Sequence, residues 1–141
     1  MTVSPTKRNI YVIDASIAVK WFSHEQGSNV ARTILKEGVD GKIELLTSDL
    51  LMYEVGNALA RGKKLGASEI LTALIMLQNS CLRFVALDVS MMEHSATFAD
   101  KYGITFYDAV YAALALRENA ILLTANPKDQ GKISEIKIKK I

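Results

Sequence analysis

Cysteine is nearly absent from this 141-residue sequence, in which Cys81 is the only one. A lone cysteine excludes a disulfide framework and favours a reducing environment. The two histidines, His24 and His94, are too few and too far apart to form a recognisable zinc motif. The sequence therefore belongs neither to the disulfide-stabilised scaffolds nor to the His/Cys zinc proteins.

Long hydrophobic runs are missing as well. The longest apolar stretch, residues 70–77, is about half the length that a membrane-spanning helix needs. The polar segment 1–8 contains Pro5 and has no apolar core of the kind found in a signal peptide. We therefore expect a soluble protein of the cytoplasm.

The composition is that of a globular chain. Half of the residues are hydrophobic, 23% are charged and the net charge is +2. The length is sufficient for a hydrophobic core, and we find no repeat, low-complexity tract or linker. We expect a single domain over residues 1–141. The small positive charge permits contact with nucleic acid without arguing for it.

Short apolar segments predict about five strands. Four are continuously apolar, as in strands buried on both faces of a parallel sheet, and the last alternates with lysines that would guard an open edge. The predicted strands span residues 10–13, 43–47, 83–87, 120–124 and 136–139. Helical patterns separate them, with capping residues expected at Ser28, Ser48 or Asp49, Ser68, Ser90 and Thr105. The order predicts a three-layer α/β fold with a parallel sheet flanked by helices.

Three acidic residues stand in apolar surroundings. Asp14 ends the first predicted strand, Glu54 lies on a mostly apolar helix face, and Asp108 opens an apolar stretch of the last helix. A buried carboxylate is costly unless it is paired, hydrogen bonded or bound to a metal. In open α/β sheets ligands bind beyond the carboxyl ends of the strands, and all three acids can lie at that rim.

Two of these acids also have simpler interpretations. Asp14 could be the N-cap of a helix, and Asp108 could form a capping box with Thr105. Taken singly, each is as compatible with a cap as with a ligand. If the acids converge, three carboxylates about 5 Å apart repel by roughly 3 kcal/mol per pair at a dielectric near 20. An all-oxygen cluster suits Mg²⁺ or Mn²⁺, which would polarise a phosphodiester and activate a water molecule.

Four segments carry a family resemblance. They are VIDASIAVKWF (12–22), DLLMYEVGNAL (49–59), YDAVYAALA (107–115) and LLTAN (122–126). Together, in this order and spacing, they resemble the PIN-domain nucleases, particularly the VapC-type toxin ribonucleases. The resemblance covers nearly the whole chain and implies a PIN fold with a five-stranded parallel sheet.

The resemblance also implies an activity, namely Mg²⁺- or Mn²⁺-dependent endonucleolytic cleavage of RNA. Carried over by position, Asp14, Glu54 and Asp108 become catalytic acids that hold the metal, and Ser16 and Thr124 become supporting hydroxyls. Members of this family are usually homodimers, and they are commonly encoded with a small antitoxin that blocks the active site.

One position departs from the family pattern. The fourth motif usually reads Thr-x-Asp, and here Asn126 stands at the acidic position. An amide brings no charge, although Asp129 is three residues away and could substitute. We expect one metal ion to bind adequately and a second poorly. The departure keeps open an alternative, a catalytically weak or inactive PIN-like module that binds RNA or protein.

Basic and apolar residues supply candidate contacts with partners. Arg61 and Lys20 are the main candidates for binding substrate phosphates, and the apolar helix at 70–77 could form a dimer or partner surface. Further basic candidates are Lys63, Lys64, Arg117 and Lys128. A dehalogenase-like phosphatase would need an acid where Ser16 stands, a response-regulator receiver lacks its acidic pair, and no glycine-rich phosphate loop is present.

Overall fold

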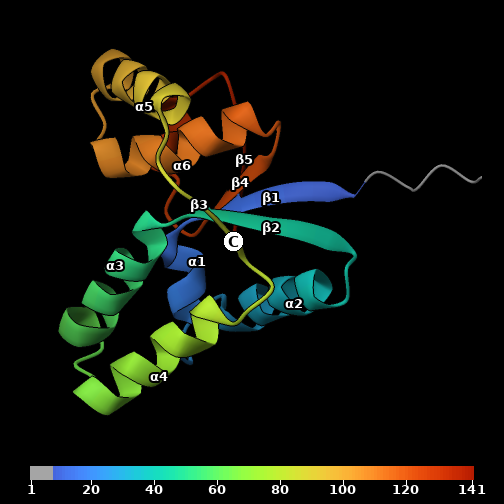
Figure 1. The fold of residues 1–141 in the computed structure, drawn as a ribbon, viewed down its shortest axis with the longest axis vertical. Coiled ribbons are helices and arrows are strands. Elements are labelled where there is room, and N and C mark those ends of the chain that lie inside the picture. Colours follow the sequence, from blue (N-terminus) through green and yellow to red (C-terminus); the bar gives the residue numbers. More distant parts are fainter. Residues whose placement is uncertain (1–7) are drawn as a thin grey trace, which may run out of the picture.

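A computed structural model describes residues 8–141, which form a five-stranded parallel sheet covered by helices on both faces (Figure 1). The strands are β1 (Asn9–Ile13), β2 (Ile43–Ser48), β3 (Arg83–Val85), β4 (Ile121–Thr124) and β5 (Lys137–Lys140). Their order in the sheet is β3-β2-β1-β4-β5, and every neighbouring pair is parallel. The expectation that the amino terminus lacks a signal peptide concerns residues that lie, except for Arg8, outside the described part.

Helices fill the connections between the strands. They are α1 (Ala15–Lys20), α2 (Ser28–Val39), α3 (Leu50–Asn57), α4 (Ala67–Gln78), α5 (Val89–Tyr102) and α6 (Phe106–Arg117). Two short elements complete the chain, the π-helical η1 (Ala58–Gly62) directly after α3 and the 3-10 turn η2 (Gln130–Lys132). In Figure 1, α1 to α4 lie on one side of the sheet and α5 and α6 on the other, which confirms the predicted three-layer arrangement.

The predicted strands are confirmed, with β3 ending at Val85 rather than at residue 87. Three predicted caps are wrong. Asp88, not Ser90, caps α5, because its side chain accepts a hydrogen bond from the amide of Met91. Likewise Gly66, not Ser68, stands at the N-cap of α4, and Gly27, not Ser28, stands at the N-cap of α2.

A glycine such as Gly38 is typical of a helix end, and the sequence predicts one there, but the residue lies within α2, which continues to Val39. A Cβ atom at this position would come within 2.7 Å of Leu45 Cδ1 and 3.1 Å of Cys81 Sγ. The glycine therefore permits α2 to approach β2 closely. The turn that follows the helix instead uses Gly41, whose φ is +75°.

The helix α6 contains the longest run of buried residues in the described part of the chain and fixes one side of the candidate site. Every residue from position 109 to position 115 is buried. Val110 and Leu114 belong to the main core against the sheet, whereas Ala109 and Ala112 pack in a second cluster with Phe98 of α5. Burial on two sides holds the first turn of α6, which carries Asp108, at the edge of the sheet.

The apolar helix α4 is buried on only part of its surface. This helix buries Ala73 and Leu77 but leaves Leu71, Ile75 and Met76 exposed. The partner surface that the sequence predicts there thus has an apolar face available. Over residues 8–141, none of the helices combines the length and hydrophobicity required to cross a membrane.

Candidate active site

Asp14 stands directly after β1 and begins α1. Its Oδ1 atom accepts hydrogen bonds from the Ser16 amide at 3.1 Å and from the Ser16 hydroxyl at 2.5 Å. The capping interpretation of Asp14 is therefore correct. The side chain is also only 8% exposed, and this burial raises its pKa against the opposing hydrogen bonds of Ser16 and Thr124. Both of these bonds use Oδ1, so the capping role of Asp14 leaves its other carboxylate oxygen able to bind a cation.

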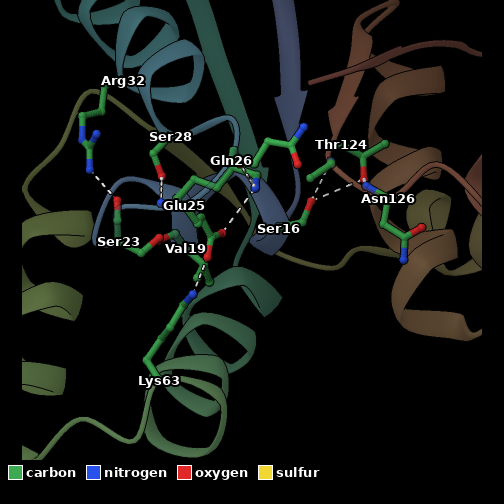
Figure 2. Close-up of polar contacts among 12 residues, drawn as sticks. Ser16, Val19, Ser23, Glu25, Gln26, Ser28, Arg32, Lys63, Thr124 and Asn126 are labelled. Atoms are coloured by element: carbon green, nitrogen blue, oxygen red, sulfur yellow. Dashed lines mark hydrogen bonds and ion pairs between the residues drawn. The ribbon is translucent and has the colours of Figure 1, made fainter.

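Ser16 connects the ends of two neighbouring strands. Its hydroxyl oxygen accepts a hydrogen bond from the Ala125 amide at 2.9 Å and lies 3.4 Å from Thr124 Oγ1 (Figure 2). Thr124 Oγ1 accepts a further bond from the Asn126 amide at 3.2 Å. Because β1 and β4 are adjacent and parallel, this network joins their carboxyl ends around Asp14.

Glu54 reaches the same rim from α3. It is half-buried, and its Oε1 atom accepts a 2.5 Å hydrogen bond from the phenolic hydroxyl of Tyr111 in α6. Burial raises the pKa of Glu54, and the negative charges of Asp14 and Asp108 raise it further against the effect of the Tyr111 hydrogen bond. The pKa of Tyr111 is raised far above its ordinary range, mainly by burial.

Asp108 lies half-buried in the first turn of α6. Thr105 caps the helix by accepting a hydrogen bond from the Asp108 amide at 3.1 Å, which confirms that half of the expected capping box. Burial raises the pKa of the Asp108 carboxyl, and the charge of Asp129 adds to this effect. The side chain of Gln130 donates to the Asp108 carbonyl at 3.3 Å and so holds η2 against α6.

These residues surround one cavity of about 180 Å³ at the carboxyl ends of the strands. Its lining consists of Asp14, Ala15, Ser16, Glu54, Asp108, Tyr111, Asn126 and Asp129. Four carboxylates thus face one small space, and no lysine, arginine or histidine is part of that lining among the described residues. Such a cavity attracts cations, and its oxygen donors match the ligands that Mg²⁺ and Mn²⁺ prefer.

The donor chemistry fits a divalent cation, whereas the side-chain placement is not that of a closed ligand shell. Within residues 8–141, no three Asp, Glu, His or Cys side chains are arranged to hold a metal ion by themselves. A hard cation that keeps several of its waters does not require direct ligation by every carboxylate. Burial raises the pKa of Asp14, Glu54 and Asp108, and a cation bound in the cavity would oppose this shift by stabilising their charged forms.

The structure also places the predicted basic residues. Lys20 forms an ion pair with Glu25 beside the acidic cavity, and Lys63 pairs with the same carboxylate. Arg61 is exposed in η1 and is not part of the lining of the acidic cavity. Arg117 pairs with Asp88, at the far end of α6 from Asp108, so its expected place at the acidic rim is wrong.

The sequence did not indicate a role for Tyr111, which lines this cavity, or for Glu25, which pairs with Lys20 beside it. Tyr111 follows Asp108 by three positions, a spacing that places both on one helix face and could have indicated a shared site. Glu25 lies in the connection between α1 and α2, where no periodic pattern exists to indicate the direction of a side chain.

The fold and cavity define an α/β protein with an acidic site beyond the carboxyl ends of its central strands. The family model described as PIN domain matches residues 11–135. The chain belongs to the PIN-domain family.

Individual relatives agree with this assignment. The chain is 33% identical over 117 residues to the protein named Ribonuclease VapC3 of Pyrobaculum aerophilum, covering 80% of this chain and 86% of that protein. It is 28% identical to Exonuclease VapC9 of the same organism, covering 81% and 78%. A solved toxin-antitoxin complex from Klebsiella pneumoniae contains a chain of similar fold, with a TM-score of 0.67, 19% identity and coverage of 93% and 99%.

Proposed function

We propose that this protein is a Mg²⁺- or Mn²⁺-dependent endoribonuclease that hydrolyses RNA phosphodiesters. The observation that carries the proposal is the cavity in which Asp14, Glu54, Asp108 and Asp129 converge without a basic residue in its lining. Nuclease activity in the names of two relatives supports the reaction class. Phosphoryl oxygens and carboxylates are the ligands that these two ions share.

Asp14, Glu54 and Asp108 would hold the cation, and Asp129 would add charge on the side of Asn126. A bound divalent ion supplies a Lewis acid that polarises the phosphodiester and lowers the pKa of an attacking water molecule. The chain contributes orientation. Ser16 directs its proton to Asp14 and fixes the oxygen that receives it, which keeps the carboxylate in one position.

Asn126 and Asp129 differ from the first three acids in what they can do. The Asn126 side chain is exposed at the cavity and can accept or donate a hydrogen bond, for example to a water molecule. Asp129 raises the pKa of Asp108 through its charge, so the two carboxylates are electrostatically coupled. We expect one metal ion to bind more tightly than a second.

The biological setting proposed here is that of a toxin in a toxin–antitoxin pair. The named fold match from Klebsiella pneumoniae supports a small antitoxin partner. The exposed apolar residues Leu71, Ile75 and Met76 on α4 are available for a second copy or for such a partner. A homodimer acting on cytoplasmic RNA is the proposed form.

A second function is favoured by one specific observation. Asn126 replaces an acid, and the remaining carboxylates are not arranged as a closed metal site within the described residues. A PIN-like module that binds RNA or protein without cleaving would have these features. Metal binding without hydrolysis of any RNA would identify it.

Incubation with a mixed cellular RNA pool and with one circular single-stranded RNA tests the proposal. Each reaction contains Mg²⁺, Mn²⁺ or EDTA, and the protein is wild type or Asp14→Asn. We expect metal-dependent cuts in both substrates, lost with EDTA and in the variant. Because a circle has no ends, its cleavage separates an endonuclease from an exonuclease. Intact RNA with folded, inhibitor-free protein would overturn the catalytic proposal.

A further inference from the structure

A second cavity, of about 440 Å³, lies beside the acidic one. The two share Ala15, Ser16 and Glu54 in their linings. The rest of the second cavity has two kinds of wall. Small apolar groups form one part, from Val19, Ala58 and Ala125. The other part is charged and contains Lys20, Glu25 and Lys63.

The charged wall is an ion-pair network with one acid between two bases. Glu25 Oε1 lies 3.3 Å from Lys20 Nζ, and Glu25 Oε2 pairs with Lys63. The two ammonium groups, Lys63 first, hold the pKa of Glu25 below its ordinary value. In Figure 2, Lys63 reaches from the end of η1 up toward Glu25, and Ser16 and Thr124 lie to the right of this ion pair.

The loop that carries Glu25 is held in place by several anchors. Ser28 Oγ accepts a hydrogen bond from the Glu25 amide at 3.1 Å, and Arg32 donates to the Ser23 carbonyl at 2.5 Å. The indole of Trp21 donates to the Ala31 carbonyl at 2.8 Å. These bonds anchor the loop to α2, so the position of Glu25 is determined by the fold.

The two lysines are not equivalent. Lys20 has a side chain only 12% exposed and also donates to the Gln26 carbonyl at 2.6 Å, so it serves the loop. Lys63 has a side chain 35% exposed and follows the π turn, which its amide closes by donating to the Ala58 carbonyl at 3.0 Å. Another anion can therefore replace Glu25 as the partner of Lys63 while the bonds of Lys20 to the loop stay intact.

A carboxylate between two ammonium groups occupies a position that suits phosphate oxygens equally well. We propose that this cavity binds the nucleotide adjacent to the scissile phosphodiester of a single-stranded RNA. Its phosphate pairs with Lys63 in place of Glu25, and its ribose and base cover the small apolar side chains of Ala58 and Ala125. This subsite rests on the proposed ribonuclease function, since it deepens substrate binding at the same site.

Glu25 therefore acts as an internal competitor of the substrate phosphate. With Glu25 in place, the network carries one net positive charge from two lysines and one carboxylate. Removal of the carboxylate charge frees Lys63 for RNA, whereas removal of the Lys63 charge leaves only Lys20, which is bound to the loop. The two substitutions change RNA affinity in opposite directions, whereas damage to the loop alone would lower the affinity in both variants.

The test is binding of a 5′-phosphorylated RNA dinucleotide to the whole chain in EDTA, followed by NMR of ¹³C-labelled alanine methyl groups. No metal is present, so binding is measured apart from cleavage. We expect shifts at Ala58 and Ala125, and none at the exposed Ala96 of α5. Glu25→Gln should tighten binding about threefold to tenfold, and Lys63→Gln should weaken it by a similar factor.

Lys101→Gln is the matched control, because Lys101 also pairs with an acid from a distant part of the chain, Glu135. It should leave dinucleotide binding unchanged. Absence of Ala58 and Ala125 shifts at millimolar dinucleotide, or equal affinity in the Glu25 and Lys63 variants, would overturn the subsite. If the protein cleaves RNA but shows no such shifts, the subsite is wrong and the ribonuclease function stands. If the shifts appear but no RNA is cleaved, the subsite stands and the ribonuclease function is wrong.

Discussion

Tyr111 donates a 2.5 Å hydrogen bond to Glu54 and thereby joins α6 to α3 at the acidic cavity. Tyr111 is 1% exposed, so its ring is fixed by the core while its hydroxyl reaches the cavity lining. A hydrogen bond to an ionised carboxylate is stronger than one between neutral groups. The relationship gives Glu54 a fixed orientation that its own half-buried helix position would not provide.

Tyr111→Phe should destabilise the protein by roughly 1–2 kcal/mol, because it removes the donor from a partly desolvated carboxylate. The same change should weaken Mn²⁺ binding, since Glu54 would lose its orientation. Urea unfolding and calorimetric titration measure the two effects. Tyr53→Phe is the control, because Tyr53 lies on α3 and is 78% exposed. Equal stability and metal affinity in both variants would contradict the positioning role.

Asp14→Asn should stabilise the metal-free protein at pH 7. Burial raises the pKa of Asp14, so the folded state favours the protonated carboxyl. The stability this group contributes is greatest below its ordinary pKa and is lost as the pH rises through the raised value. We therefore expect the variant to have the larger free energy of unfolding at pH 7 when no metal ion is bound.

The advantage of Asp14→Asn should shrink as the pH falls toward the ordinary pKa of the carboxyl. Thermal unfolding in EDTA between neutral and acid pH follows this difference. The asparagine oxygen can still accept the two bonds from Ser16. A variant less stable than wild type at pH 7 would show that Asp14 serves mainly as a helix cap.

Ser16→Ala should lower stability and activity together. The Ser16 hydroxyl donates to Asp14 and accepts from the Ala125 amide, so its loss leaves both groups without that partner. A cost of roughly 1–3 kcal/mol is typical for unsatisfied buried polar groups. Chemical denaturation and RNA cleavage rates measure the effects. Ser90→Ala, at an exposed position of α5, should change neither, and equal behaviour of the two variants would contradict the connecting role of Ser16.

Asn126→Asp should raise Mn²⁺ affinity several-fold, because it adds a carboxylate to the cavity lining where the family pattern has one. Asp129→Asn should lower the affinity, since Asp129 supplies charge on that side of the cavity. The exposed Asn79→Asp, which adds the same charge at the end of α4, controls for net charge. A gain as large in the control would assign the effect to long-range electrostatics.

The parallel sheet flanked by helices and the position of three acids at its rim could be predicted from the sequence, whereas the order of the strands was not predicted. Buried parallel strands leave continuous apolar runs, and an acid that ends such a run, as Asp14 does, stands at the strand-end rim. The α6 stretch from Ala109 to Ala115 is apolar on every face, and burial on two sides follows from this. These signals are local, so one sequence suffices to read them.

Other features depend on tertiary contacts that no local pattern records. Gly38 resembles a helix stop in sequence and is instead a point of close contact with Leu45. The ion pair of Lys63 with Glu25 joins residues 38 positions apart in the sequence, one directly after η1 and the other between α1 and α2. Arg117 and Asp108 lie at opposite ends of α6, so the length of the helix carries Arg117 away from the acidic rim to its ion pair with Asp88.

The most direct test of the account is the position of a bound metal ion. Crystals soaked in Mn²⁺ would be measured by anomalous diffraction, beside crystals of Asp14→Asn grown in the same way. The account predicts an anomalous peak in the cavity lined by Asp14, Glu54 and Asp108, absent or strongly reduced in the variant. A wild-type cavity without a peak at saturating Mn²⁺, or a peak that persists in the variant, would contradict it.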